Sequence, residues 1–303
     1  MLTIFTIPKA FRGHIGIIQT NAIRSWLSLQ PACEVILFGN DEGTAELASE
    51  LGIRHVADVE CSEYGTPLVR SIFSIAQDIA SHRLMCYVNA DIILVSDFLP
   101  AVQRVHKYPF LIVGQRWDVE LKEPVNFDGE QWEPWLRSHV ANYGKLHPRT
   151  GIDYFVFPRG LYDYIPPFAI GRGGWDNWLI YRARSLKVPV IDATKAITAI
   201  HQNHDYSHIP GGETDVWRGP ESERNIELMD NRKAFSLEYV TFSLTTQGLK
   251  PALTLRHIYF RMRAIPVLYP HFYLLLTLFR FFEKFVRIVR SIKNIALSHL
   301  GSI

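Results

Sequence analysis

The residues with the clearest chemical potential follow an apolar segment, Leu84–Val88, that continues into Asn89, Ala90 and Asp91. Side chains alternate along a strand, so Asn89 and Asp91 are expected to point to the same side. The crevice beyond the carboxyl ends of the strands is the usual ligand site of an open α/β sheet, and a carboxylate there is well placed to hold a divalent cation. A solvated turn after the strand would explain the same residues.

A glycine-rich segment, Gly-Arg-Gly-Gly-Trp-Asp-Asn-Trp at residues 171–178, leads into a helical pattern at Trp178–Leu186. Glycines let other groups approach the backbone closely. Asp176 is expected at the start of the helix, where an aspartate can be a helix cap and nothing more. The tryptophans Trp175 and Trp178 offer flat apolar faces for a ring-shaped ligand.

Three histidines, His201, His204 and His208, lie within eight residues after the apolar run Ile197–Ile200. Neutral imidazole is a common metal ligand, and three are more than a protein core would need. They could also belong to an ordinary polar loop. A structural zinc site is not indicated, because no cysteine pair lies nearby.

The segments that must position these groups alternate between two periodicities. Strands are expected at Leu2–Ile7, Glu34–Phe38, Arg54–Val56, Leu84–Val88, Phe110–Gly114, Tyr154–Phe157 and Val188–Asp192. Helices are expected at Thr20–Leu29, Thr44–Leu51, Pro67–Ala80 and Trp178–Leu186. This alternation predicts βαβ units, and therefore a sheet covered by helices. After Asp97 the pattern is less regular, and loops are expected to dominate an aromatic and acidic stretch at Trp117–Trp135.

The order of these features resembles the nucleotide-sugar domain of GT-A glycosyltransferases over residues 2 to about 97. A loop leads into a helix with Arg70 near its start, and an apolar strand then ends in an acid. That family has Asp-x-Asp at this place, whereas this chain has Asn89 before Asp91. The resemblance implies a Rossmann-like, mixed but mostly parallel sheet flanked by helices. It also implies a nucleotide diphosphate sugar as donor and a divalent cation, Mn²⁺ or Mg²⁺, as cofactor.

The same resemblance implies roles for single residues. Residues 171–178 look like the Gly-Gly-Glu-Asp type motif beside the acceptor, which makes Asp176 the candidate base that takes the acceptor proton. His201, with His204 as second choice, would join Asp91 around the cation. The expected nucleotide-sugar-binding residues are Thr6, Pro8, Lys9, Arg70, Asn89, Ala90, Asp91, Asp153, Gly174 and Trp175. Arg70 could equally form a surface salt bridge, and Asp153 and the segment 6–9 could be plain loop residues.

Positive charge is concentrated at the C-terminus. The chain has a formal net charge of +2, but the residues from Pro251 onward carry +7 and residues 1–250 carry −5. The main body therefore gives no indication of nucleic-acid binding. Residues 264–279 are apolar but too few to span a bilayer, which needs about 20 residues. Beyond them Arg280, Lys284, Arg287 and Arg290 share one helical face, opposite an apolar face formed by Phe281, Phe285, Ile288, Ile292 and Ile295. Such a helix suits the interface of an anionic membrane, or it packs on the body or on a second subunit of a homo-oligomer.

The division expected along the chain is a transferase domain at residues 1–245 and a basic amphipathic tail at residues 251–303. Three scattered cysteines, Cys33, Cys61 and Cys86, favour a reducing compartment. The first residues read as a strand and not as a leader peptide. We therefore expect a cytoplasmic protein, peripheral on the inner face of the plasma membrane.

The function expected is transfer of a sugar to a hydroxyl of a growing polysaccharide or a lipid-linked glycan. A sugar-phosphate nucleotidyltransferase is the alternative among enzymes, but Pro8–Gly13 is a poor version of its glycine-rich phosphate loop. A membrane-docked scaffold that has kept the fold without activity is a further alternative, because Asn89 replaces an acid. Metal-dependent nucleotide binding would separate a scaffold from an enzyme.

Overall fold

A computed structural model describes residues 1–129, 131–205 and 212–271 of the chain, with the single positions 277, 281 and 284. The chain divides into two compact units, residues 1–252 and residues 253–303. The first unit contains both sheets. In the second unit, Thr254 caps the start of the helix α9 (Leu255–Leu268), and its hydroxyl accepts a hydrogen bond from the backbone N–H of His257. Within the described residues no helix is both long and apolar enough to cross a membrane. Most of the amphipathic segment expected at residues 280–295 lies outside the described residues.

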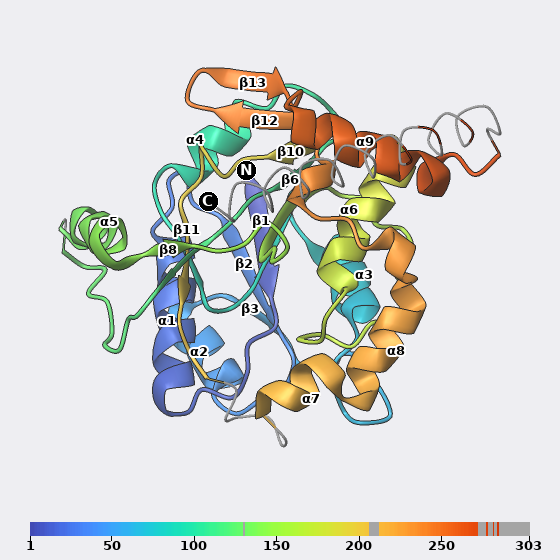
Figure 1. Cartoon of the computed structure of the whole chain (residues 1–303). Coiled ribbons are helices and arrows are strands. Elements are labelled where there is room, and N and C mark those ends of the chain that lie inside the picture. The colour runs from blue at the N-terminus through green and yellow to red at the C-terminus, as the bar shows by residue number, and fades with distance from the viewer. Residues whose placement is uncertain (130, 206–211, 272–276, 278–280, 282–283, 285–303) are drawn as a thin grey trace, which may run out of the picture. The chain divides into compact units, whose positions relative to one another are not determined.

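A nine-stranded sheet forms the centre of the first unit (Figure 1), with the order β13-β12-β10-β6-β9-β4-β1-β2-β3. Its strands are β1 (Leu2–Thr6), β2 (Glu34–Phe38), β3 (Arg54–Val56), β4 (Leu84–Val88), β6 (Leu111–Val113), β9 (Tyr154–Pro158), β10 (Val190–Asp192), β12 (Phe242–Thr245) and β13 (Gly248–Pro251). The pairs of β1 with β2 and β4, of β2 with β3, and of β10 with β6 and β12 are parallel. Only β9 and the edge strand β13 run against their neighbours. The predicted α/β class, with a mixed but mostly parallel sheet, is confirmed.

Helices cover both faces of this sheet. The described helices of the first unit are α1 (Gly13–Leu27), α2 (Thr44–Leu51), α3 (Val69–Ile79), α4 (Phe98–Gln103), α5 (Trp132–Tyr143), α6 (Trp175–Ser185), α7 (Gly212–Arg218) and α8 (Pro220–Met229). In Figure 1, α1 and α2 lie on one side of the sheet and α3 and α6 on the other. The first helix begins at Gly13 and not at the predicted Thr20. The sequence did not indicate this start, because glycines such as Gly16 are unfavourable inside helices. A glycine is needed at this position because an added Cβ would lie 2.9 Å from the carbonyl carbon of Phe11.

An aromatic cluster holds the strands that lead to the site. Phe5 on β1 lies edge-on to Phe73 of α3 at 5.1 Å and to Tyr87 of β4 at 5.6 Å, while Phe73 stacks on Phe157 at 5.6 Å. On the other face, the indole N–H of Trp26 donates to the carbonyl of Ile92 at 2.9 Å. These buried rings fix β1 and β4, whose carboxyl ends carry Lys9 and Asp91.

A second, smaller sheet was not expected from the sequence. It contains β5 (Ile92–Leu94), β11 (Ala199–Gln202), β7 (Trp117–Val119) and β8 (Lys145–Leu146), in the order β5-β11-β7-β8. The sequence analysis expected loops at Trp117–Trp135, but β7 and the first turn of α5 lie there. Strands of two to four residues have too short a pattern to be recognised, and their partners are far away in sequence. The pairing of β5 with β11 sets Ile92 beside His201.

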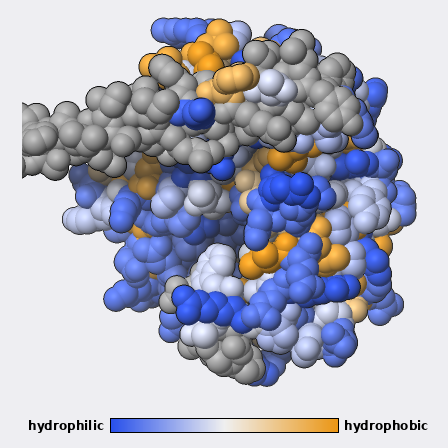
Figure 2. All heavy atoms as spheres, turned by 45° about the vertical axis from the view of Figure 1, so that its right-hand side comes forward, coloured by the Kyte–Doolittle hydropathy of each residue, from blue (hydrophilic) through white to orange (hydrophobic). Residues whose placement is uncertain are grey.

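The face that carries α3, α6 and α8 is mainly hydrophilic, with a patch of hydrophobic side chains near its middle (Figure 2). This is the pattern of helices whose apolar stripe is turned to the core. In α3 the stripe consists of Val69, Ile72, Phe73 and Ala76, all buried.

Candidate metal and catalytic site

Asp91, His201 and His204 meet where β4 ends and the small sheet begins. The nearest oxygen of Asp91, Oδ2, lies 3.1 Å from Nε2 of His204 and 3.7 Å from Nε2 of His201. One ligand atom from each residue can be chosen so that all three lie within 4.8 Å of one another. Ligands about 2.1 Å from a cation, at right angles to each other, lie about 3 Å apart. The three groups therefore have the spacing of a coordination site.

The orientation of both imidazoles favours a cation. Nδ1 of His201 lies 3.3 Å from a carboxylate oxygen of Asp118, and Nδ1 of His204 lies 2.7 Å from the backbone oxygen of Asp205. With its proton on Nδ1, His204 donates to this backbone oxygen and turns the lone pair of Nε2 towards Asp91, whereas Nδ1 of His201 has no hydrogen-bond partner among the described residues. Lone pairs that face a carboxylate need a proton or a cation between them. The other oxygen of Asp91, Oδ1, is buried without a hydrogen-bond partner. These residues fit a divalent cation.

The charge of Asp91 is stabilised by its neighbours. Burial alone would raise the pKa of Asp91, but His201, His204 and Lys9 together hold that pKa well below its usual range. A carboxylate that stays ionised at all physiological pH values is the form that binds a cation.

Asp118 supports the site from behind, and sequence analysis missed it. Its carboxylate binds Nε of Arg116 at 2.9 Å and Nδ1 of His147 at 2.7 Å, in addition to its contact with His201. In the sequence, the local sign of a strand here is that the polar residues Arg116 and Asp118 flank the apolar Trp117. Their meeting with His201 depends on the parallel pairing of β7 with β11, in which Asp118 lies opposite His201.

Replacing Asp118 by Asn should lower the affinity for Mn²⁺ by about 10- to 100-fold, which is the usual effect of losing the partner that orients a metal-binding histidine. Calorimetric titration with Mn²⁺ measures this. The exposed Asp128, changed to Asn, is the matched control and should bind as the wild type does. An unchanged affinity in the Asp118 variant would mean that His201 does not need this carboxylate.

Asn89 is engaged with Asp153. Its side-chain amide donates to Oδ1 of Asp153 at 2.7 Å, and its backbone N–H donates to the backbone oxygen of Asp153 at 2.9 Å. The guanidinium of Arg116 lies 2.5 Å from the other carboxylate oxygen of Asp153. Asp153 is thus buried and held from two sides. Asn89 places this second carboxylate beside the site, although it adds no charge of its own.

Asp176 lies in the first turn of α6, as predicted. The helix is preceded by Gly174 at a φ of 101°, a left-handed conformation that favours glycine, and Met229 lies 3.2 Å from where a Cβ would be. Burial raises the pKa of Asp176 to about 7, although the N–H groups of Asn177 and Ile152 lower it, and the nearby charge of Asp153 raises it further. A carboxylate with a pKa near 7 is suited to act as a general base.

Two further basic side chains, Lys9 and Arg172, interact electrostatically with each other, and Lys9 also interacts with Asp91. Lys9 follows β1, and its backbone is fixed by Gln19, which exchanges hydrogen bonds with both its N–H and its carbonyl. Burial lowers the pKa of Lys9, while Asp91 raises it and Arg172 lowers it, so Lys9 interacts with both charges. Arg172 was part of the glycine-rich segment but was given no role. It binds Glu221 of α8 at 2.9 Å.

Other predicted residues stand apart from this cluster. Arg70 forms an ion pair with Glu60 and lines a separate cavity of about 730 Å³, so the structure does not bring it to Asp91. Thr6, Pro8 and Ala90 are buried. His208 lies outside the described residues.

The expected role of the tryptophans needs correction. Trp175 and Trp178 are each only 5% exposed. Trp175 packs edge-on against Tyr87 at 5.3 Å, because α6 must bury its apolar stripe on the sheet. Neither ring has a face free for a sugar.

No family model matches the sequence, and no curated protein matches it. Solved structures with a similar fold include glucosyl-3-phosphoglycerate synthase from Mycobacterium tuberculosis with Mg²⁺ and uridine diphosphate, at 15% identity and a TM-score of 0.47 over 78% of this chain and 80% of that chain. They also include S. aureus TarS 1–349 with UDP-GlcNAc, at 12% identity and a TM-score of 0.46 over 69% of this chain. The match spans 60% of the TarS chain. Both likenesses concern the fold alone.

Proposed function

We propose that this chain is a glycosyltransferase that moves a sugar from a nucleotide diphosphate sugar to a hydroxyl of a glycan or a lipid-linked acceptor. The observation that carries the proposal is the meeting of Asp91, His201 and His204, with both imidazoles turned to one carboxylate oxygen. A divalent cation, Mn²⁺ or Mg²⁺, bound by these residues supplies charge stabilisation for the diphosphate as it leaves.

In this proposal the remaining groups bind and orient the two substrates. Lys9 and Arg172 offer positive charge for the phosphate oxygens. Asp176 takes the proton of the acceptor hydroxyl while that oxygen bonds to the sugar carbon and the bond from this carbon to the phosphate oxygen breaks. Asn89 and Arg116 hold Asp153 near Asp176. The charge of Asp153 there raises the pKa of Asp176, the proposed base.

The test is a thermal-shift panel of UDP, GDP, ADP and CDP with and without Mn²⁺. We expect Mn²⁺ to enhance the stabilisation of the wild type by at least one of the four, since a ligand that binds only the native state raises the melting temperature. The double variant His201→Gln/His204→Gln should lose this enhancement. The exposed His106, changed to Gln, should keep it. No shift for the wild type with any nucleotide would favour the scaffold over an enzyme.

For the second unit we propose attachment to an anionic membrane, with the protein peripheral on the cytoplasmic face of the plasma membrane. The net charge of +7 beyond residue 250 and the opposed basic and apolar faces of the sequence at residues 280–295 support this. A lipid-linked acceptor would place the substrate at the same surface.

Truncation after residue 252 should release the protein from anionic vesicles without loss of Mn²⁺-dependent nucleotide binding. Each basic residue near such a surface contributes about 1 kcal/mol to membrane binding. The truncated protein should therefore lose nearly all of its vesicle binding at physiological salt. Co-sedimentation with phosphatidylserine vesicles measures it, and neutral vesicles are the control. Equal sedimentation of both proteins would contradict the membrane assignment.

A further inference from the structure

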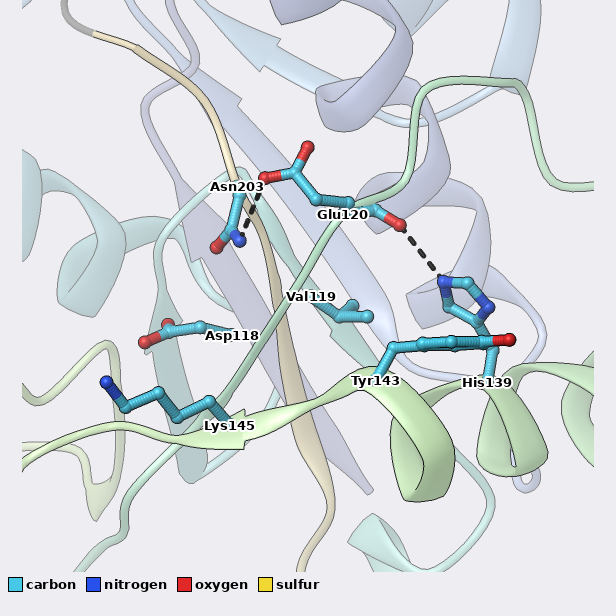
Figure 3. Close-up of a pocket in the computed structure, with 7 residues that line it drawn as sticks. All are labelled: Asp118, Val119, Glu120, His139, Tyr143, Lys145 and Asn203. Carbon is cyan, nitrogen blue, oxygen red and sulfur yellow. Dashed lines mark hydrogen bonds between the residues drawn. The ribbon is translucent and has the colours of Figure 1, made fainter.

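Figure 3 shows a cavity of about 530 Å³, which adjoins the candidate metal site through Asp118. Six of the side chains that line it are Asp118, Glu120, His139, Tyr143, Lys145 and Asn203. It is connected to the site through Asp118, which lines the cavity and also contacts His201. A molecule in this cavity would therefore lie one residue away from the cation-binding cluster.

Aromatic side chains form a row along the outer face of α5 beside this cavity. Trp135, His139 and Tyr143 are four residues apart and share one side of the helix. The rings of Trp135 and His139 stack at 5.5 Å, and those of His139 and Tyr143 lie 5.0 Å apart. Trp135 is 50% exposed and Tyr143 is 74% exposed.

The row is largely exposed, with Trp135 at 50% and Tyr143 at 74%, and does not form the buried contact of α5 with the body. The buried anchors of the helix lie on the adjoining face, where Leu136 and Val140 belong to a cluster with Val119 and Ile200. Exposed tryptophan and tyrosine side chains beside a cavity are typical of a binding surface, because they offer a flat apolar face with a polar edge.

Polar groups surround the rings in the cavity. Glu120 accepts a hydrogen bond from the Asn203 amide at 3.1 Å, and its backbone carbonyl lies 3.1 Å from Nε2 of His139 (Figure 3). Lys145 and Tyr143 add a donor and a hydroxyl. Acceptors, donors and flat rings together match a sugar ring, which has apolar C–H faces and hydroxyls at its rim. Both signs of charge are present, which favours a neutral ligand.

We propose that this cavity and the aromatic row on α5 bind sugar units of a neutral acceptor glycan, away from the unit that receives the transferred sugar. This inference rests on the proposed function, since it names the acceptor class of the same active site. The row extends along α5 from the cavity beside Asp118, so several consecutive units could bind along it. The preferred acceptor is accordingly an oligosaccharide and not a single sugar.

The test is the affinity of the full chain for a glycan array of neutral hexose and N-acetylhexosamine oligosaccharides. The wild type should bind at least one oligosaccharide of three or more units. Tyr143→Ala should weaken this binding about tenfold, which is the scale of a lost ring contact, and Trp135→Ala should weaken it for the longer chains. Tyr143→Phe keeps the ring and should keep most of the affinity.

Tyr108, which is 53% exposed elsewhere on the surface, is the matched control, and Tyr108→Ala should bind as the wild type does. Circular dichroism checks that each variant is folded. Wild-type protein that binds no oligosaccharide, or a Tyr143→Ala variant that binds as tightly as the wild type, would overturn the proposal. Either result alongside intact Mn²⁺-dependent nucleotide binding would leave the proposed transferase function standing, whereas a flat nucleotide panel would contradict that function instead.

Discussion

The Asp91→Asn variant is expected to lose Mn²⁺-dependent binding of a nucleoside diphosphate and about a thousandfold in the rate of sugar transfer. A metal contributes several kcal/mol of charge stabilisation in such reactions, and a thousandfold corresponds to about 4 kcal/mol. Asparagine has nearly the same size, and the backbone oxygen of Asp91 still accepts the two hydrogen bonds from Gln202. The substitution therefore removes the charge while the fold around it is kept.

Calorimetry with Mn²⁺ and a transfer assay with the nucleotide sugar that stabilises the wild type measure these two losses. His201→Gln should show a smaller decrease, because one carboxylate and one imidazole remain. Asp128→Asn, on an exposed loop, is the control of equal chemistry. If Asp91→Asn retains Mn²⁺-dependent nucleotide binding, the cation is held elsewhere and the proposed site is incorrect.

The meeting of Asp91 and His201 was foreseeable because both residues follow apolar runs in the sequence, and strand ends are where the ligands of an α/β sheet collect. The sequence could not reveal how they meet. His201 belongs to β11, which pairs antiparallel with β5 directly after Asp91. Such pairing joins residues more than a hundred positions apart, and neither strand is long enough to show a period.

The same limit explains the residues that were missed. Asp118 lies on β7, a strand of three residues in a stretch expected to be loop, and Arg116 directly precedes that strand. Trp175 was misjudged for a different reason, since the sequence around it suggested exposure beside glycines. Its burial follows from the packing of α6 on the sheet, where Trp175 contacts Tyr87 and Phe155, and no local pattern reports such long-range contacts.

The Asp176→Asn variant is expected to lose about 10²- to 10⁴-fold in turnover while it keeps Mn²⁺-dependent nucleotide binding. This range is the usual contribution of a positioned general base. Because the pKa of Asp176 is raised to about 7, wild-type turnover should rise with pH through about 7 and level off above it, and this rise should be absent from the variant. The exposed Asp163, changed to Asn, should leave both the rate and its pH profile as in the wild type.

Stability gives an independent measure of the same carboxylate. Its pKa in the unfolded chain is about 3.9, so between pH 4 and 7 the unfolded state releases a proton that the native state retains. The free energy of unfolding of the wild type therefore falls as pH rises through this window. Asp176→Asn removes that loss. The free energy of unfolding of the variant should therefore exceed that of the wild type by about 1 kcal/mol or more at pH 8, and by a smaller amount at pH 5. Denaturant unfolding at the two pH values measures the difference. A variant that is inactive but more stable at pH 8 would identify Asp176 as a buried base, whereas equal destabilisation at both pH values would indicate that its role is to cap α6.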